Sequence, residues 1–212
     1  MSKRSLFLTF EGMDGSGKTT QMRLLAGRLR REGRAVLESA EPGGTPIGMQ
    51  VRRVLLDSAN DELRPTAELL LYFACRAQNV EQWILPALAE GKIVLSDRFT
   101  DSTLAYQGSG RGLGAEIVLE LDRIACRGLV PDVTLLIDID AETSLARARA
   151  RNATAPDAET RMDEQSIEFH RSVYEAYHAL ASREQHRVRI IDGRADREAI
   201  AREIWGIVEP YV

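Results

Sequence analysis

Short apolar runs, separated by longer stretches with helical spacing, divide this chain into alternating segments. Brief, near-continuous runs of valine, isoleucine and leucine are typical of strands that are buried on both faces. Each of the first four runs is followed by a helical pattern, which predicts an α/β fold with a parallel sheet and helices on both faces. With a weaker fifth run the sheet has five strands, at residues 5–10, 35–39, 92–97, 133–140 and 187–192.

The longest helical candidate covers residues 65–90, and two stripes run along it. Leu69, Phe73, Val80 and Ile84 share one face at helical spacing, which indicates a core stripe. A second stripe beside it mixes polar and aromatic residues, namely Tyr72, Arg76, Asn79 and Trp83. From the residues alone this second stripe is either a binding wall or a partly exposed helix shoulder.

Composition narrows the class of protein. The 212 residues suit one domain, and no linker or low-complexity segment divides them. A net charge of -4 and a pI near 5.5 argue against a general nucleic-acid binder. No apolar stretch is long enough for a signal peptide's core or a membrane span, and two cysteines lack partner spacing. We therefore expect a cytoplasmic protein with reduced thiols and with no nucleic-acid or membrane partner.

The segment "GMDGSGKT" fits the phosphate-loop pattern G-x-x-x-x-G-K-[ST]. It directly follows a predicted strand and opens a predicted helix, so backbone N–H groups and the helix dipole would face an anion. Lys18 is expected to reach the β- and γ-phosphates, and the Thr19 hydroxyl to ligate Mg²⁺. The predicted ATP-binding loop comprises Gly12, Met13, Asp14, Gly15, Ser16, Gly17, Lys18 and Thr19.

A phosphate loop alone leaves several protein classes open. A guanine-reading N-K-x-D element is missing from the sequence, since no asparagine is followed by lysine. Motor and recombinase ATPases are usually larger and work as assemblies. The size of the chain and its several arginine-bearing segments favour a small-molecule kinase.

Five segments together resemble a known family, thymidylate kinase of the bacterial type. The resemblance covers nearly the whole chain and implies one kinase domain over residues 1–212, with a short mobile lid at about 149–162. It also implies transfer of the γ-phosphoryl group of ATP, with Mg²⁺, to thymidine monophosphate, and a homodimer. The matching segments are "EGMDGSGKTTQ" (11–21), "EPGGTPIG" (41–48), "ELLLYFACR" (68–76), "LSDRFTDSTLAYQGSGRG" (95–112) and "RARARN…ETRMDE" (147–164).

The resemblance assigns the acceptor nucleotide to residues spread over the first half of the chain. Tyr72 matches an aromatic that stacks on thymine, Arg76 a base-reading arginine, and Arg98 the arginine on the acceptor phosphate. Asp14 matches an acidic residue near the acceptor's sugar and phosphate. The remaining assigned positions are Glu41 and Pro42 bordering the acceptor, Arg52 as a further phosphate contact, and Thr103, Tyr106 and Gln107 along base and sugar.

The resemblance also locates the catalytic charge. Animal and yeast relatives carry an arginine in the phosphate loop where this chain has Gly15, and the bacterial form places its arginines in the lid. Of the lid arginines we expect Arg151 and Arg161 to reach the transferring group, with Arg147 beside the ATP adenine. The predicted catalytic residues are thus Lys18, Arg98, Arg151, Arg161 and Asp14, and the predicted metal residues are Thr19 and Asp97.

Phosphate chemistry supports an anionic acceptor without reference to any family. A monophosphate has a second pKa near 6, so it needs no general base, but it does need fixed positive charge against repulsion. Asp97 could alternatively orient Arg98. Two other functions stay open: another nucleotide or deoxynucleoside kinase of the same core, with Glu41 recruited as a base, and a non-catalytic nucleotide sensor.

Overall fold

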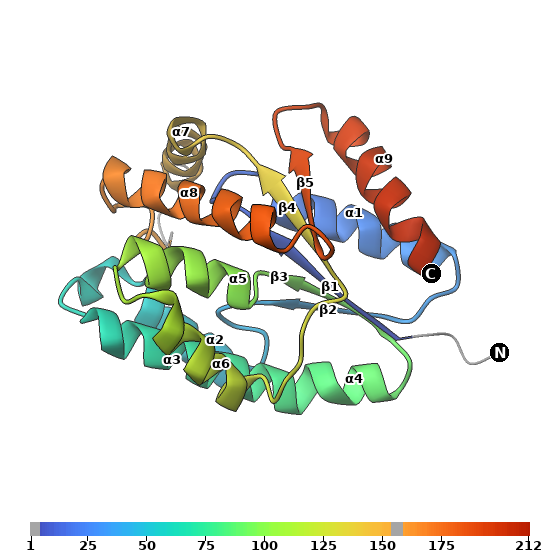
Figure 1. The fold of residues 1–212 in the computed structure, drawn as a ribbon, viewed down its shortest axis with the longest axis horizontal. Helices are drawn as coiled ribbons and strands as arrows, with labels where there is room; N and C mark the ends of the chain where they lie inside the picture. The colour runs from blue at the N-terminus through green and yellow to red at the C-terminus, as the bar shows by residue number, and fades with distance from the viewer. Residues whose placement is uncertain (1–4, 154–158) are drawn as a thin grey trace.

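A computed structural model describes residues 5–153 and 159–212 of the chain (Figure 1). The described strands form one sheet in the order β2-β3-β1-β4-β5, and all neighbouring strands are parallel. This confirms the predicted α/β fold with a five-stranded parallel sheet. The strands are β1 (Leu6–Glu11), β2 (Val36–Ala40), β3 (Ile93–Asp97), β4 (Val133–Asp138) and β5 (Val188–Asp192).

The helices follow the strands as the alternating pattern predicts. The predicted helix at 65–90 is continued through a π-helical turn, Val80–Ile84, that separates α3 from α4. Strand β4 ends before residue 140 because Asp140 is the N-cap of α7, and its side chain accepts from the Thr143 amide at 2.8 Å. The helices are α1 (Lys18–Arg31), α2 (Pro46–Leu56), α3 (Pro65–Asn79), α4 (Leu85–Ala89), α5 (Thr100–Thr103), α6 (Ala115–Ala125), α7 (Ala141–Asn152), α8 (Ile167–Arg183) and α9 (Arg197–Val208).

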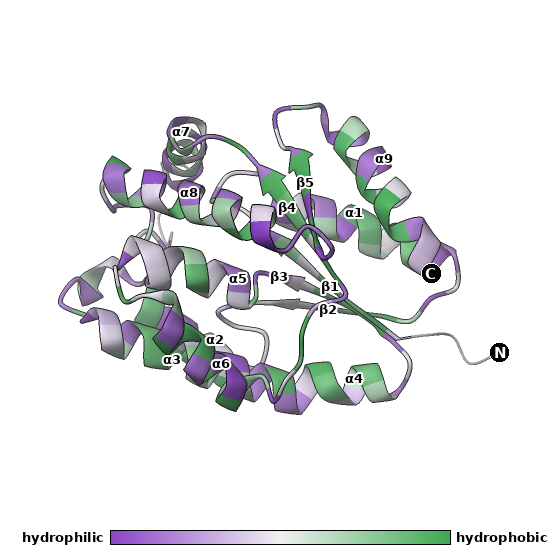
Figure 2. Cartoon of the chain, viewed as in Figure 1, coloured by the Kyte–Doolittle hydropathy of each residue, from purple (hydrophilic) through white to green (hydrophobic). Residues whose placement is uncertain are grey.

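Alternate residues of each central strand pack against opposite helical layers. Leu6, Leu8 and Phe10 of β1 join a buried cluster with α1 and α9, whereas Phe7 joins one with α3 and α6. Burying both faces explains why the strands read as continuous apolar runs rather than as alternating ones. Hydrophobic colouring accordingly runs along β4 and β5, while the surrounding helices are mixed (Figure 2).

The register of the sheet gathers three strand ends beside the phosphate loop. Phe10 of β1 pairs with Asp97 of β3, and Glu11 pairs with Leu136 of β4. The chain segments that leave these strands therefore emerge next to one another, at the edge where open α/β sheets bind ligands. Among the described helices, none combines the length and apolar character needed to cross a membrane.

Candidate active site

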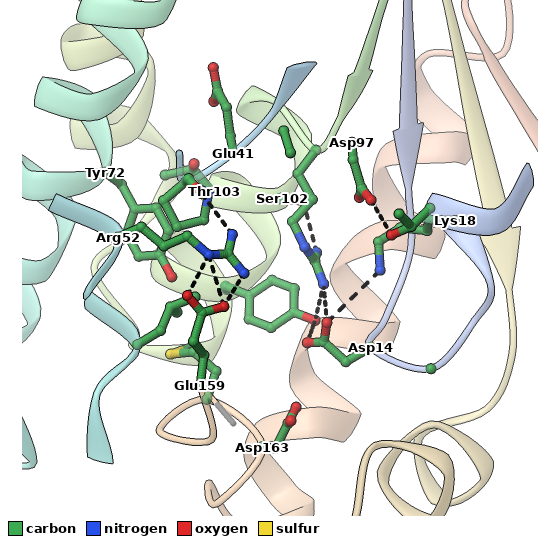
Figure 3. A pocket seen from close by; sticks show the side chains of 18 of the residues that line it. Asp14, Lys18, Glu41, Arg52, Tyr72, Asp97, Ser102, Thr103, Glu159 and Asp163 are labelled. Atoms are coloured by element: carbon green, nitrogen blue, oxygen red, sulfur yellow. Dashed lines mark hydrogen bonds and ion pairs between the residues drawn. The ribbon is translucent and has the colours of Figure 1, made fainter. Parts of the chain in front are cut away.

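A cavity of about 810 Å³ lies beyond the carboxyl ends of β1, β2 and β3. The phosphate loop forms one side of it, and side chains of α2 and α3 with the end of the predicted lid form the other. Figure 3 shows Lys18 and Asp14 on one side of this pocket and Arg52 with Glu159 on the other. Such a volume accommodates small-molecule ligands.

Two glycines of the phosphate loop, Gly12 and Gly15, combine a positive φ with a close approach of neighbouring atoms. Gly12 has φ +127°, and a Cβ there would lie 2.3 Å from the carbonyl oxygen of Ile137. Gly15 has φ +75°, and its Cβ would lie 2.7 Å from the Cβ of Arg147. These positive φ angles turn the backbone between β1 and α1. The loop therefore meets a ligand with main-chain N–H groups and the N-terminus of a 14-residue helix.

Lys18 lies inside the loop. Its Nζ donates to the Met13 carbonyl at 2.9 Å and lies 4.0 Å from Asp14 Oδ1. The Met13 side chain is buried in the core, so only its backbone faces the loop. Ser16 Oγ is buried without a hydrogen-bond partner among the described residues. The loop is anchored from outside by Ser144 of α7, whose Oγ donates to the Asp14 carbonyl at 2.6 Å.

The two predicted metal residues lie in contact, since the Thr19 hydroxyl donates to Asp97 Oδ2. A hydroxyl and a carboxylate at a helix N-terminus are hard oxygen donors of the kind Mg²⁺ prefers. Magnesium is usually held by one or two carboxylates together with nucleotide phosphates, rather than by a protein cage. The described residues contain no cluster of three or more histidine, cysteine, aspartate or glutamate side chains that could hold a metal ion. The donor set fits a magnesium–nucleotide complex.

Arg98 connects the phosphate loop to the acceptor side. It directly follows β3 with φ +72°, a left-handed conformation that is uncommon outside glycine and often marks a functional site. Its NH2 donates to Asp14 Oδ1 at 2.9 Å and to the Tyr106 hydroxyl at 3.2 Å. Burial alone would raise the pKa of Asp14, but Arg98 and Lys18 outweigh it and lower that pKa below its usual range. Asp14 is therefore an anion between two cations.

The second stripe of α3 faces the cavity and is more deeply buried than an exposed helix shoulder would be. Arg76 is 1% exposed, its Nε donates to Glu41 Oε2 at 2.6 Å, and its NH2 donates to Thr103 Oγ1 at 2.9 Å. Its NH1 is buried and has no hydrogen-bond partner among the described residues, although the residue lines the cavity. Tyr72, one turn earlier, lines the same cavity half-buried. The wall thus offers a ring face and an unused donor.

Arg52 lies at the other end of the cavity. Its NH1 donates to the Pro42 carbonyl at 2.7 Å, while its Nε donates to both carboxylate oxygens of Glu159 at 2.7 and 2.8 Å. Glu159 belongs to the predicted lid, so a lid carboxylate covers the guanidinium that the family resemblance assigns to phosphate. Arg52 and Glu159 both line the cavity.

The predicted lid begins within α7. Arg151, in the last turn of that helix, lines the cavity, and its NH2 donates to Asp163 Oδ2 at 2.8 Å. Arg147, one turn earlier, lies against the outside of the phosphate loop, with its NH1 3.3 Å from the Gly15 carbonyl oxygen. Residues 154–158, in the middle of the predicted lid, lie outside the described part of the chain.

Comparison with known proteins adds an independent finding. A family model described as thymidylate kinase matches residues 10–204. The chain is 50% identical over 199 residues to the thymidylate kinase of Pelobacter propionicus, covering 93% of this chain and 91% of that protein. It is also 50% identical over 204 residues to that of Thermomicrobium roseum, covering 96% and 94%. The chain belongs to the thymidylate kinase family.

A solved thymidylate kinase has the same fold. The crystal structure of the enzyme from Ehrlichia chaffeensis matches with a TM-score of 0.77 at 32% identity, covering 97% of this chain and 99% of that one. The predictions of a thymidylate kinase fold and of a nucleotide-binding kinase are therefore confirmed.

Not every residue predicted for the kinase site lies in the cavity. Arg161 is 4% exposed and points away from it, with its Nε donating to the Leu55 carbonyl at 2.5 Å and its NH1 to Glu68 Oε2 at 2.7 Å. Arg147 also lies outside the residues that line the cavity. Most other predicted residues are brought together there, namely Asp14, Gly15, Gly17, Lys18, Thr19, Glu41, Pro42, Arg52, Tyr72, Arg76, Asp97, Arg98, Thr103, Tyr106, Gln107 and Arg151.

Several side chains around the kinase site were missed by sequence reasoning. Tyr177 of α8 receives a hydrogen bond from Arg98 NH1 at 3.2 Å, and Ser102 Oγ receives another at 3.0 Å. Ser102 stands beside the predicted Thr103, so the motif could have included it. Tyr177 gives no local signal, because its hydroxyl reaches the site only through the packing of α8 on the sheet.

Proposed function

We propose that this chain transfers the γ-phosphoryl group of ATP to dTMP, forming dTDP and ADP, in a site of the bacterial type whose catalytic charge comes from the lid. One observation carries the proposal: the phosphate-loop lysine and a second anion-binding arginine, Arg98, converge on Asp14 in one cavity. Two anion sites that share a wall suit two phosphate-bearing substrates. Membership of the thymidylate kinase family makes dTMP the acceptor.

The acceptor's base occupies the wall formed by Tyr72 and Arg76. The unpartnered NH1 of Arg76 donates to a base oxygen, which satisfies a buried donor that is otherwise costly. Tyr72 stacks on the base, and its hydroxyl stays protonated, because burial, followed by Glu68, raises its pKa further above its usual value. Arg98 holds the phosphate, with Arg52 as a second contact once it leaves Glu159.

ATP occupies the phosphate loop. Its β- and γ-phosphates meet the loop N–H groups and Lys18, whose exchangeable partner is the Met13 carbonyl at 2.9 Å. Thr19 and Asp97 hold the Mg²⁺ that neutralises phosphate charge when it is bound. Arg147, beside the Gly15 carbonyl, borders the adenine.

The reaction needs positioned charge and no general base. A dTMP oxygen, already ionised near neutral pH, forms a bond to the γ-phosphorus, and the bond to the ADP oxygen breaks in line with it. Burial of Lys18 and Arg98 places their charge where water is largely excluded, which strengthens it. Gly15 lets the loop pack closely against α7 but supplies no charge of its own.

We assign the missing charge to Arg151 rather than to Arg161. Arg151 lines the cavity and exchanges its contact with Asp163 for the transferring group. Arg161 instead fastens the far end of the lid to Glu68 on α3. The whole chain works as one kinase domain, with a lid at about 149–162.

The contacts of Glu41 argue against a deoxynucleoside kinase, for which this residue was the candidate general base. Glu41 is 4% exposed, accepts from Arg76 at 2.6 Å and accepts from Asn79 Nδ2 at 3.1 Å. Both oxygens of this carboxylate are already engaged by a buried guanidinium and an amide, so neither is free to contact a 5′-hydroxyl. The structure therefore favours a phosphate acceptor.

The family resemblance implies a homodimer, and exposed apolar side chains on the surface support this proposal. Apolar side chains are exposed on the adjacent helices α2, α3 and α6: Ile47 54%, Val54 45%, Leu70 51%, Leu119 52% and Ile124 69%. A patch of this kind marks an interaction surface. Light scattering on the wild-type protein and on Leu119→Glu tests the assignment, since a monomeric wild type contradicts it.

The proposed reaction is tested by identifying its products. Phosphorus NMR of the enzyme with ATP, Mg²⁺ and dTMP is expected to show dTDP and ADP in equal amounts. Inorganic phosphate should stay at a small fraction of the ADP, because lid closure excludes water as the acceptor. ADP with inorganic phosphate and no dTDP would contradict the proposal.

A further inference from the structure

A buried carboxylate behind the cavity contacts one of the residues that line it. Glu68, in the first turn of α3, is 0% exposed and lies outside the cavity lining. Its Oε1 accepts a hydrogen bond from Nε2 of Gln107 at 2.8 Å. Gln107 is 1% exposed and does line the cavity. The pair therefore leads from the interior of the protein to the acceptor pocket.

Glu68 is held in its ionised form by its neighbours. Arg111 NH2 donates to Glu68 Oε2 at 3.0 Å, and Arg161 NH1 donates to the same oxygen at 2.7 Å. Burial would raise the pKa of Glu68, but hydrogen bonds from Arg111 and Gln107 outweigh it and lower that pKa below its usual value. An ionised carboxylate can only accept hydrogen bonds. The end of the Gln107 amide that faces Glu68 must therefore be its NH₂ group.

This contact sets the polarity of the pocket. The carbonyl and the NH₂ group of an amide lie on opposite sides, so committing Nε2 to Glu68 leaves Oε1 of Gln107 for the cavity. Arg76, which lines the same cavity, has a buried and unpartnered NH1 donor. Arg76 and Gln107 thus offer a donor and an acceptor to a base. Thymine matches them with its O4 acceptor and N3–H donor, whereas cytosine has an amino donor in place of O4 and an unprotonated N3.

We propose that Glu68 is a positioning residue that makes this enzyme select thymine over cytosine, by locking the Gln107 amide with its carbonyl oxygen toward the base. The inference rests on the proposed function and adds to it the origin of base selectivity. Glu68 does not touch the nucleotide. Its effect passes through the orientation of one amide group.

The test compares two acceptors that differ only in hydrogen-bond polarity. dTMP and 5-methyl-dCMP share the sugar, the phosphate and the 5-methyl group, so their ratio of kcat/KM isolates the contacts at O4 and N3. Glu68→Gln lets the amide at residue 107 turn over, because a glutamine can donate or accept. We expect the dTMP to 5-methyl-dCMP ratio to fall about tenfold, as for one misdirected buried hydrogen bond. The exposed Glu62→Gln is the matched control and should leave the ratio unchanged.

A double variant distinguishes a change in the hydrogen-bond polarity of residue 107 from a general disturbance of the pocket. The carboxylate introduced by Gln107→Glu accepts hydrogen bonds on either side, whichever way it turns. Combining Glu68→Gln with Gln107→Glu should therefore restore the preference for dTMP, although the residue behind the pocket is still altered. If Glu68→Gln fails to fold, Glu68→Asp takes its place, since it keeps the charge for Arg111 and Arg161 but withdraws the oxygen from Gln107.

The outcomes separate this inference from the proposed function. A wild type that phosphorylates dTMP, together with a Glu68 variant whose ratio stays within about twofold of it, overturns the positioning role. A wild type that uses both acceptors equally overturns it as well. A wild type that does not phosphorylate dTMP at all refutes the proposed function instead.

Discussion

The donor half of the pocket is one continuous loop between β1 and α1, whereas the acceptor half is assembled from separate segments: the end of β2, α2, α3, α5 and η3 (Leu104–Gly110). In the donor half, the groups that face a ligand are backbone N–H groups, and glycine supplies the space they need. In the acceptor half they are side chains, and each guanidinium is held by a carboxylate: Arg76 by Glu41, Arg98 by Asp14 and Arg52 by Glu159.

The donor half therefore recognises the charge of a phosphate, whereas the acceptor half recognises which base is bound. Backbone N–H groups and a helix dipole recognise any phosphate and therefore suit the common donor. Side chains can distinguish bases, but only if their donors and acceptors are fixed beforehand. Buried ion pairs add little net stability, because desolvation offsets the attraction. In the acceptor half, the buried pair of Arg76 and Glu41 instead holds the Arg76 donors in place.

The largest loss of activity is expected for Arg98→Ala. The variant removes the cation that contacts Asp14 at 2.9 Å, so phosphoryl transfer should fall about 10³-fold or more. ATP affinity should change little, because the phosphate loop is untouched. Steady-state kinetics and ATP titration check this, with the exposed Arg53→Ala as control. Near-normal turnover would show that the acceptor phosphate is held elsewhere.

Gly12→Ala tests the donor half of the pocket, as Arg98→Ala tests the acceptor half. A Cβ at this residue would lie 2.3 Å from a backbone oxygen of Ile137, which no side-chain rotation can relieve. We expect KM for ATP to rise by roughly tenfold to a hundredfold while dTMP affinity is retained. Gly112→Ala is the control, because Gly112 also has a positive φ (+70°) but nothing lies within 4 Å of its Cβ. An equal loss of dTMP affinity would break the distinction between the halves.

The same distinction explains what the sequence could predict. The donor loop is contiguous in sequence, so a short pattern was enough to predict it. The strands were predicted from their apolar runs. Acceptor residues such as Tyr72 and Arg98 were assigned through resemblance to a family. Glu68 and Tyr177 were missed because they act through contacts between distant segments, and Arg161 looked like a lid residue until packing placed it against α3.

The two lid arginines should behave differently. Arg151→Ala is expected to lower kcat by about tenfold or more at unchanged thermal stability, because Arg151 is half-exposed at the cavity. Arg161→Ala leaves Glu68 with a broken buried pair and should lower the melting temperature instead. Kinetics and thermal unfolding of both variants check this. A fall in kcat only for Arg161→Ala would reverse the assignment.

The smallest effect on activity is expected at Glu11, and the prediction there concerns stability. The Glu11 carboxylate accepts hydrogen bonds from the Phe99 amide at 2.7 Å and from the Tyr177 hydroxyl at 3.0 Å. Burial, followed by the charge of Asp101, raises the pKa of Glu11 from 4.5 to about 7. In that interval the folded protein binds more protons than the unfolded chain, so stability falls as pH rises through it. The contribution is complete below 4.5 and is lost above about 7.

Glu11→Gln should remove this dependence on pH. Relative to the variant, the wild type should lose about 3 kcal/mol of unfolding free energy as the pH rises through this interval. Urea unfolding at several pH values measures the difference. Parallel profiles for the two proteins would show that Glu11 keeps an ordinary pKa.

The central claim is that the acceptor half binds a phosphate-bearing thymine nucleotide. The most direct measurement is ADP release with ATP and Mg²⁺ when either dTMP or thymidine is the acceptor. The account predicts turnover with dTMP and none above background with thymidine, because Arg98 needs an anion and Glu41, the candidate base, is already held by Arg76 and Asn79. Turnover with thymidine but none with dTMP would contradict it.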